Sequence, residues 1–151
     1  SIHNIHEDSL DLELKLKELC HNFTFCETEL IYNIEHDFSM RTKYSLISIT
    51  KEALSNVMKH SSATFVTLSF EEHANEYEIK IQDNGKQVFL PNASKDDSGM
   101  GLNSIRERIE ALDGHFHIDR SEGFMIYITI PKSEAASSDT ADKDQIHQND
   151  I

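Results

Sequence analysis

Three groups of residues in this sequence have types and spacings that suit chemistry. The first group is a polar row within residues 52–60, made of Glu52, Asn56, Lys59 and His60. A helix turns about 100° per residue, so the last three of these side chains lie within about 80° of the first. The apolar residues between them fall on the other side, between about 100° and 240°, as a core face: Ala53, Leu54, Val57 and Met58. A helix here would carry a polar face beside a buried one.

The polar row has the donor and acceptor types that a magnesium and phosphate site needs. The side-chain oxygen of Asn56 is a hard ligand suited to Mg²⁺, which takes few protein ligands and keeps several waters. Lys59 could meet a phosphate as a point charge, and Glu52 could accept a proton from a hydroxyl group or water. A solvated polar stripe on a surface helix would have the same pattern.

The second group is Asp83-Asn84-Gly85, directly after a predicted strand. The carboxylate of Asp83 could accept a hydrogen bond from an adenine amino group, and Gly85 would let the backbone come close. Asp-Asn-Gly is also a strong turn signal, so an ordinary turn remains an alternative.

The third group is Gly99-Met100-Gly101-Leu102, at the start of a predicted helix. Glycines at a helix N-terminus expose backbone N–H groups and the positive end of the helix dipole, which suits a phosphate. A single Gly-x-Gly also occurs in many helices that bind nothing.

The elements that would position these groups follow from periodicity. Helices are predicted at 10–20, 41–60 and 101–112, the first from composition against an alternating leucine pattern, and the last closed by Asp113-Gly114. Strands are predicted at 30–35, 64–71, 76–82, 115–120 and 124–130, with a hairpin at 73–75 and a long loop at 83–99. The mixed order predicts an α+β two-layer sandwich with helices on one face of a mixed, mostly antiparallel sheet.

Composition limits the classes of partner. The chain has 151 residues, 38% of them apolar, and a formal charge of −13, so nucleic acid and anionic membrane surfaces are expected to be repelled. No segment reads as a membrane span or a signal peptide. Cys20 and Cys26 are expected to be free thiols in a reducing cytoplasm. A nucleotide would need a local cation or a helix N-terminus, because the chain itself is acidic.

Taken in order, the three groups resemble a known family. The run EALSNVMKHSSA resembles the N box of sensor histidine kinase catalytic domains, DNG resembles the first glycine box, and SGMGLNSIRERIEALDG resembles the second. The pattern GL-x-x-I-R-E-R is similar to the bacterial subfamily that pairs with NarL/LuxR-type response regulators. The resemblance covers roughly residues 10–132 and implies the Bergerat ATP-binding fold, shared with gyrase, Hsp90-like chaperones and MutL.

The resemblance also implies roles. Asn56 would bind Mg²⁺, Asp83 would contact the adenine of ATP, and Glu52 would act near the γ-phosphate. Lys59, His60 and Lys86 would lie by the phosphates, with Lys95 a further candidate, and the loop 86–98 would be a lid. The pocket and lid would be shaped by Gly85, Gly99, Met100, Gly101 and Leu102. The sequence departs from the family pattern at Gln87, where a glycine is usual, and at Phe124, where a threonine hydroxyl is usual.

The same resemblance divides the chain into a linker at 1–9, the ATP-binding domain at 10–132 and an acidic tail at 133–151 that is expected to be disordered. His6 and His36 each precede an acidic residue, but neither lies in a two-helix hairpin, so the phosphoacceptor histidine is expected in another domain. The partners expected are ATP, that dimerisation domain and a response regulator, and the fragment itself is expected to be monomeric. Two alternatives are a degenerate docking module without catalysis and an anti-sigma-factor serine kinase.

Overall fold

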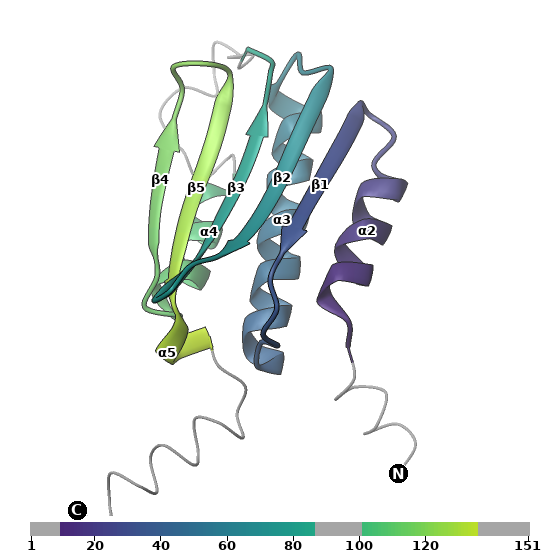
Figure 1. Ribbon diagram of the computed structural model, residues 1–151. Helices are drawn as coiled ribbons and strands as arrows, with labels where there is room; N and C mark the ends of the chain where they lie inside the picture. The colour runs from purple at the N-terminus through teal and green to yellow at the C-terminus, as the bar shows by residue number, and fades with distance from the viewer. Residues whose placement is uncertain (1–9, 87–100, 136–151) are drawn as a thin grey trace, which may run out of the picture.

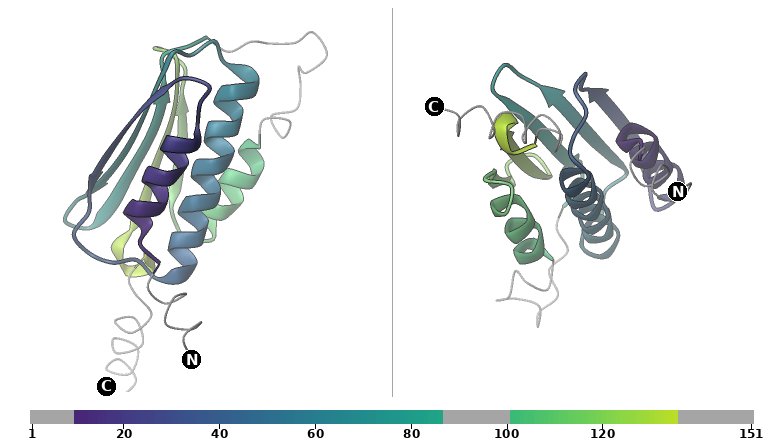
Figure 2. Two further views of the ribbon diagram at one scale, coloured as in Figure 1. Left: turned by 90° about the vertical axis from the view of Figure 1, so that its right-hand side faces the viewer. Right: turned by 90° about the horizontal axis from the view of Figure 1, so that it is seen from below.

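The computed structural model describes residues 10–86 and 101–135, which form two layers (Figure 1). One layer is a five-stranded sheet in the order β1-β2-β3-β5-β4. The helices α2, α3 and α4 all cover the same face of that sheet, as the side and end views show (Figure 2). The predicted α+β sandwich is confirmed, with the apolar core between the two layers.

The sheet is mixed, as predicted, with one parallel pair. Its strands are β1 (Glu27–Asn33), β2 (Phe65–Glu72), β3 (Glu76–Asp83), β4 (His115–Asp119) and β5 (Phe124–Pro131). β1 runs parallel to β2, while the β2–β3, β3–β5 and β4–β5 pairs are antiparallel. The first strand begins three residues before the predicted 30–35, because its pairing with β2 starts at Glu27 opposite Phe65.

The first helix, α2 (Leu12–Asn22), confirms that composition outweighs the alternating leucines. Asp11 caps it by accepting a hydrogen bond from the Leu14 N–H at 3.2 Å. Leu12 and Leu16, one turn apart, are buried, whereas Leu14 between them is exposed. The helical period therefore decides which leucines enter the core.

The longest helix, α3 (Met40–His60), begins at Ser39, whose hydroxyl accepts from the Thr42 N–H, and ends at Ser61. Met58 was placed on its buried face, and that prediction is wrong, because the side chain is 51% exposed. Met58 lies at about 240° from Glu52, just beyond the buried arc. Asn56, at about 40°, falls inside that arc and is buried.

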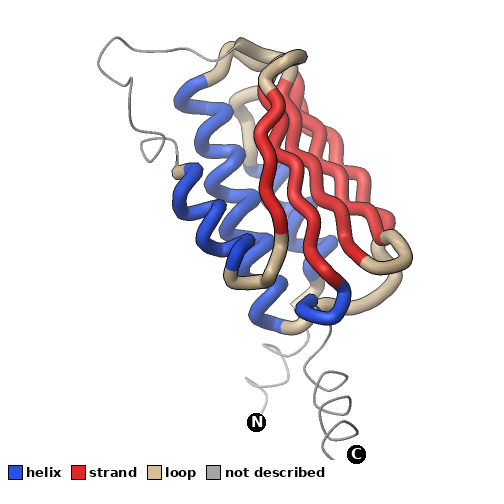
Figure 3. Tube along the Cα trace, turned by 90° about the vertical axis from the view of Figure 1, so that its left-hand side faces the viewer, coloured by secondary structure: helices blue, strands red, loops and turns tan. Residues whose placement is uncertain are grey.

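The C-terminal part completes the sandwich. α4 (Leu102–Glu110) buries Leu102, Ile105 and Ile109 against the sheet, and Figure 3 shows it beside α3 in the helical layer. α5 (Lys132–Ala135) follows β5 directly, so the first three residues of the predicted tail 133–151 are helical. None of the helices in the described ranges has both the length and the apolar composition that crossing a bilayer requires.

The sheet has two ends with different surroundings. We call the end where α3 and β3 finish and β2 starts the site end, which is uppermost in Figure 1. The opposite end, where α2 and α3 start and α5 follows β5, is called the terminal end. Because β2 and β3 are antiparallel, Glu72 finishes β2 at the terminal end and Asp83 finishes β3 at the site end.

Candidate functional site

Asp83 is a buried carboxylate at the site end, with only 2% of its surface exposed. Its Oδ1 atom accepts two hydrogen bonds, from the Gly85 N–H at 2.8 Å and from the Ser61 hydroxyl at 3.1 Å. Its Oδ2 atom is also buried but has no hydrogen-bond partner in the described ranges. A buried polar atom without a partner costs about 1–3 kcal/mol, so an unpaired carboxylate oxygen suits a ligand that brings a donor.

The electrostatics of Asp83 follow from this environment. Burial raises the pKa of its carboxyl group, and the hydrogen bonds from Gly85 and Ser61 act in the opposite direction. The raised pKa means that the protein alone stabilises the charged form incompletely. A donor on a ligand would complete the stabilisation of the carboxylate.

The residues after Asp83 form the turn that the Asp-Asn-Gly pattern predicts. Asn84 accepts from the N–H groups of Thr64 at 2.9 Å and Phe65 at 3.1 Å, and its Nδ2 donates to the Thr64 hydroxyl at 2.9 Å. A Cβ atom on Gly85 would overlap the backbone of Ala63, so no larger residue fits there. The turn is therefore a fixed structural element, and it engages only the Oδ1 atom of the Asp83 carboxylate.

Asn56 lies on α3, between Glu52 and the C-cap residue Ser61 along the chain. It is only 4% exposed. The solvated-stripe alternative is thereby excluded for Asn56. Its Nδ2 atom is buried without a hydrogen-bond partner in the part of the chain that the structure describes. Two orphaned polar groups, on α3 and at the end of β3, thus occur at one end of the fold.

Glu52 and Gly101 form the third part of the site. Gly101 precedes α4 with φ at 71°, and a Cβ atom there would overlap the Glu52 carboxylate. Glycine is therefore required both by the left-handed backbone and by the close approach of Glu52. Leu102, the first residue of α4, is buried and anchors the helix start. The predicted Gly99 and Met100 lie outside the described residues, as do Gln87 and Lys95.

The remaining predicted residues lie at the edge of this site. Lys59 and Lys86 are exposed, and His60 is half-buried. The backbone of Lys86 is fixed by two hydrogen bonds with Ser62, N–H to hydroxyl and N–H to carbonyl, both at 3.1 Å. The structure shows no hydrogen bond or ion pair from these side chains to Asp83 or Asn56, so their roles toward phosphates stay predictions.

Sequence reasoning missed Ser61, which follows the predicted helix 41–60 and donates to Asp83. Its position carried a signal, since it lies between the helix with Asn56 and the strand that pairs with the Asp83 strand. In the described ranges no group of three or more His, Cys, Asp or Glu residues could hold a metal ion. A cation here would need ligands from water and a bound molecule in addition to Asn56, which is the coordination that Mg²⁺ prefers.

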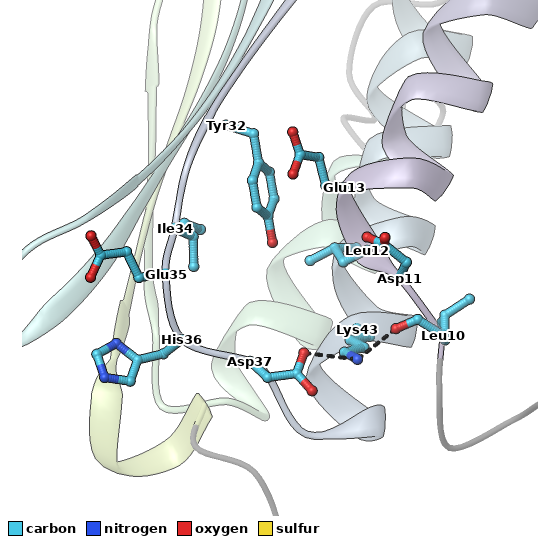
Figure 4. Close-up of a pocket in the computed structure, with 10 residues that line it drawn as sticks. All are labelled: Leu10, Asp11, Leu12, Glu13, Tyr32, Ile34, Glu35, His36, Asp37 and Lys43. Carbon is cyan, nitrogen blue, oxygen red and sulfur yellow. Dashed lines mark hydrogen bonds and ion pairs between the residues drawn. The ribbon is translucent and has the colours of Figure 1, made fainter. Parts of the chain in front are cut away.

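A pocket at the terminal end has a different character (Figure 4). Lys43, buried at the start of α3, donates to the Leu10 carbonyl at 2.6 Å and pairs with the Asp37 carboxylate at 2.9 Å. Tyr32 faces the same pocket, and burial with nearby carboxylates raises the pKa of its hydroxyl group. The buried cation in this pocket is already paired, so the pocket ties α3 to the segment before α2.

Comparison with known proteins bears on what the site end does. The family model described as "Histidine kinase-, DNA gyrase B-, and HSP90-like ATPase" matches residues 42–134. The NarQ sensor protein homolog of Haemophilus influenzae is 37% identical over 89 residues, 57% of this chain and 15% of that protein. The sensor histidine kinase DesK of Bacillus subtilis is 31% identical over 97 residues, 64% of this chain and 26% of that protein.

Solved structures share the fold. A histidine kinase domain from the blue-light activated histidine kinase of Erythrobacter litoralis has a TM-score of 0.67 at 15% identity, covering 84% of this chain and 64% of that one. The ATP-binding domain of PrrB from Mycobacterium tuberculosis has a TM-score of 0.60 at 19% identity, covering 80% of this chain and 90% of that one. The chain therefore spans most of one domain but a small part of the curated relatives it matches.

Proposed function

Because this chain belongs to the family of histidine kinase-, DNA gyrase B- and HSP90-like ATPases, we propose that it is the ATP-binding catalytic domain of a sensor histidine kinase. It binds ATP with Mg²⁺ and transfers the γ-phosphoryl group to a histidine on another domain of the parent protein. A response regulator of the NarL/LuxR type then receives the phosphoryl group. The relatives named above are sensor proteins that extend far beyond this domain, which supports a separate acceptor domain.

The observation that carries the proposal is the pair of orphaned polar groups at the site end. The unpaired Oδ2 atom of Asp83 has the chemistry to accept a hydrogen bond from the amino group of adenine. Asn56 brings a buried side-chain amide to the same end: its orphaned Nδ2 is a donor suited to a phosphate oxygen, and its oxygen is the atom that would contribute to a Mg²⁺ site. A base acceptor and a cation ligand are the two functions that Mg·ATP requires of its binding site.

The phosphates meet the other predicted residues. Mg²⁺ neutralises phosphate charge when bound, which a chain of net charge −13 needs. The start of α4 at Gly101 offers backbone N–H groups and the positive end of the helix dipole. Glu52, whose carboxylate lies beside this glycine, is the candidate to orient the reacting groups near the γ-phosphate. Lys59, His60 and Lys86 are the candidates to contact phosphate oxygens.

The proposal is tested by calorimetric titration of the chain with a non-hydrolysable ATP analogue, with and without Mg²⁺, and with the GTP analogue as a control. We expect adenine-selective binding that weakens when Mg²⁺ is removed. Asn56→Ala should lose the dependence on Mg²⁺ while circular dichroism shows an intact fold. Absence of binding in both conditions would contradict the proposal and favour a degenerate docking module.

Phosphoryl transfer is tested in the parent protein. The wild-type parent should accumulate an acid-labile, base-stable phosphate on a histidine when given labelled ATP. Glu52→Gln should reduce the rate of that labelling much more than it reduces ATP affinity, because the proposed role of Glu52 is near the γ-phosphate. Equal losses in rate and affinity would instead assign Glu52 to binding.

A further inference from the structure

Ser61 connects the two elements that carry the proposed ATP contacts. It is the C-cap of α3, where its N–H donates to the Val57 carbonyl at 3.1 Å. Its side chain is directed to Asp83, which lies at the end of β3, and its hydroxyl also accepts from the Ala63 N–H at 3.1 Å. Only 7% of Ser61 is exposed, so this hydroxyl has little competition from water.

The two donors to Asp83 act on the same oxygen atom. Ser61 and Gly85 both donate to Oδ1. The Ser61 hydroxyl is itself held in place, because it accepts a hydrogen bond from the Ala63 N–H. This leaves Oδ2 as the carboxylate oxygen that has no partner in the described ranges. The arrangement fixes which oxygen is engaged by the protein and which one remains for a ligand.

No other side chain in the described ranges supplies a donor to Asp83. The residues opposite Asp83 in the sheet are Val66 of β2 and Phe124 of β5, which are buried and have no hydroxyl. Gly123 beside Phe124 has φ at 81° and lies so close to the Asp83 carbonyl that a Cβ atom would overlap it. The neighbouring strand therefore restrains the backbone of Asp83, while the end of α3 restrains its carboxylate.

We propose that Ser61 is the positioning residue for base recognition, holding the Asp83 carboxylate so that Oδ2 faces an exocyclic amino group of a purine nucleotide. This inference rests on the proposed function, because it assumes that Asp83 contacts the base. Without the Ser61 hydroxyl the carboxylate keeps only the Gly85 N–H, so one hydrogen bond restrains it in place of two. Ordering the Asp83 carboxylate then costs free energy when the ligand binds, and the affinity falls.

The main variant is Ser61→Ala, with Ser61→Thr as the conservative variant that keeps a hydroxyl. Ser69→Ala is the matched control, because Ser69 is another buried serine, in β2, and it makes no hydrogen bond to Asp83. Ser61→Cys replaces Ser61→Ala if the alanine variant does not fold. All variants are measured by calorimetry with ATP and with purine riboside triphosphate, which lacks the exocyclic amine.

We expect Ser61→Ala to bind ATP about tenfold more weakly, since a hydrogen bond to a charged group contributes roughly that factor. The affinity for the analogue without the amine should be unchanged, so the preference for ATP over that analogue falls by the same factor. Ser61→Thr and Ser69→Ala should keep that preference. A merely structural role would lower the affinity for both nucleotides together, and that result would overturn the proposal.

A second readout does not require nucleotide. The Asp83 carboxyl group is titrated by carbon NMR in the free protein, where Ser61→Ala should move its midpoint to higher pH, because a hydrogen bond to the charged form is lost. Cys26 is the titratable neighbour that the charge of Asp83 influences, and burial already raises the pKa of its thiol, so it stays protonated in this range. An unchanged midpoint would overturn the positioning role.

Failure of this inference and failure of the proposed function give different results. If Asp83→Asn weakens ATP binding but Ser61→Ala does not, Asp83 contacts the base without help from Ser61, and the inference is wrong. If wild-type protein does not bind ATP, the proposed function is wrong, and the base-recognition role of Ser61 is lost with it.

Discussion

Glu72 and Asp83 end neighbouring antiparallel strands at opposite ends of the sheet, and their carboxylates have opposite surroundings. Glu72, at the terminal end, accepts from the Lys132 ammonium group at 2.9 Å and from the N–H groups of Glu35 at 3.0 Å and His36 at 3.2 Å, and it pairs with the His36 ring. Asp83, at the site end, has two donors on one oxygen and none in the described ranges on the other.

The pKa values move in opposite directions for these reasons. The Lys132 ammonium group first, and the His36 and Glu35 donors with it, lower the pKa of Glu72 to about 2 against the effect of burial. Burial raises the pKa of Asp83 despite its two donors. A carboxylate whose two oxygens both have partners can hold parts of the chain together. Glu72 does this between α5 and the segment that follows β1. A carboxylate that lacks a partner on one oxygen is maintained at a cost, which is expected where a ligand binds.

The largest expected effect distinguishes the two carboxylates by function. Asp83→Asn should weaken ATP binding by tenfold or more, because hydrogen bonds to charged groups are worth about 1.5–3 kcal/mol. Glu72→Gln is the matched control and should bind ATP as the wild type does. Calorimetry on both variants checks this, and a similar loss in both would show that the two ends are not functionally distinct.

A second substitution tests how tightly the site end is packed. Gly101→Ala should lower the free energy of unfolding by about 1–2 kcal/mol, because an alanine is strained in the left-handed region. It should also displace Glu52, whose carboxylate occupies the position of the added Cβ atom. Urea denaturation measures the first effect. Adding Glu52→Ala in the same chain should relieve the overlap but not the backbone strain, so only part of the stability should return.

Stability should respond to the carboxylate at the terminal end. Glu72→Gln should lower the free energy of unfolding by about 1 kcal/mol, because a neutral amide oxygen accepts more weakly from the Lys132 ammonium group and the backbone. Asp83→Asn should leave stability unchanged or raise it, since it removes a buried, incompletely stabilised charge. Urea denaturation of both variants at neutral pH checks the contrast, which is lost if Asp83→Asn is the less stable variant.

The smallest effect is a difference in pH dependence. The stabilisation from Glu72 is complete above its ordinary pKa of 4.5 and is lost as the pH falls toward about 2. The deficit in stability of Glu72→Gln relative to wild type should therefore shrink on acidification.

Asp83 has a raised pKa, so its contribution to stability is complete in acid and is lost as the pH rises through the folded-state pKa. Any gain in stability of Asp83→Asn over wild type at neutral pH should therefore also disappear in acid. Acidification thus removes a deficit in the Glu72 variant and a gain in the Asp83 variant. Denaturation curves at neutral pH and at about pH 3 test this.

The fold was predictable where hydrophobic periodicity and residues that end helices and strands marked the elements. The helical spacing around Leu54 and Val57, the alternation in 64–71 and 76–82, and the glycines before the helix at 101–112 predicted α3, β2, β3 and α4 with errors of a few residues. The short helix α5 was not predicted. The start of β1 was missed because it depends on parallel pairing with Phe65, a contact that no local pattern encodes. Met58 was misplaced because a fixed helical period does not define where the buried arc ends.

The sequence identified candidate site residues but not their geometry. Asp83 and Asn56 were identified from their types and order in the chain, which the resemblance then reinforced. The sequence could not show that both are buried or that each has a polar atom without a partner in the described ranges. The bond from Ser61 to Asp83 spans 22 positions, so it arises only when α3 and β3 pack together.

The parallel pairing of β1 with β2 has a consequence for how the chain is made on the ribosome. β1 ends at Asn33, but its partner strand is complete only at Glu72. At a synthesis rate of about 5–20 residues per second, β1 waits about 2–8 s for that partner. The side of β1 that packs on the core includes Leu30 and Tyr32. Of the elements described, α2 alone is already synthesised at that stage, and it contacts β1 in the finished fold. Among the described elements, the helix that precedes the strand is therefore the one available to cover it during translation.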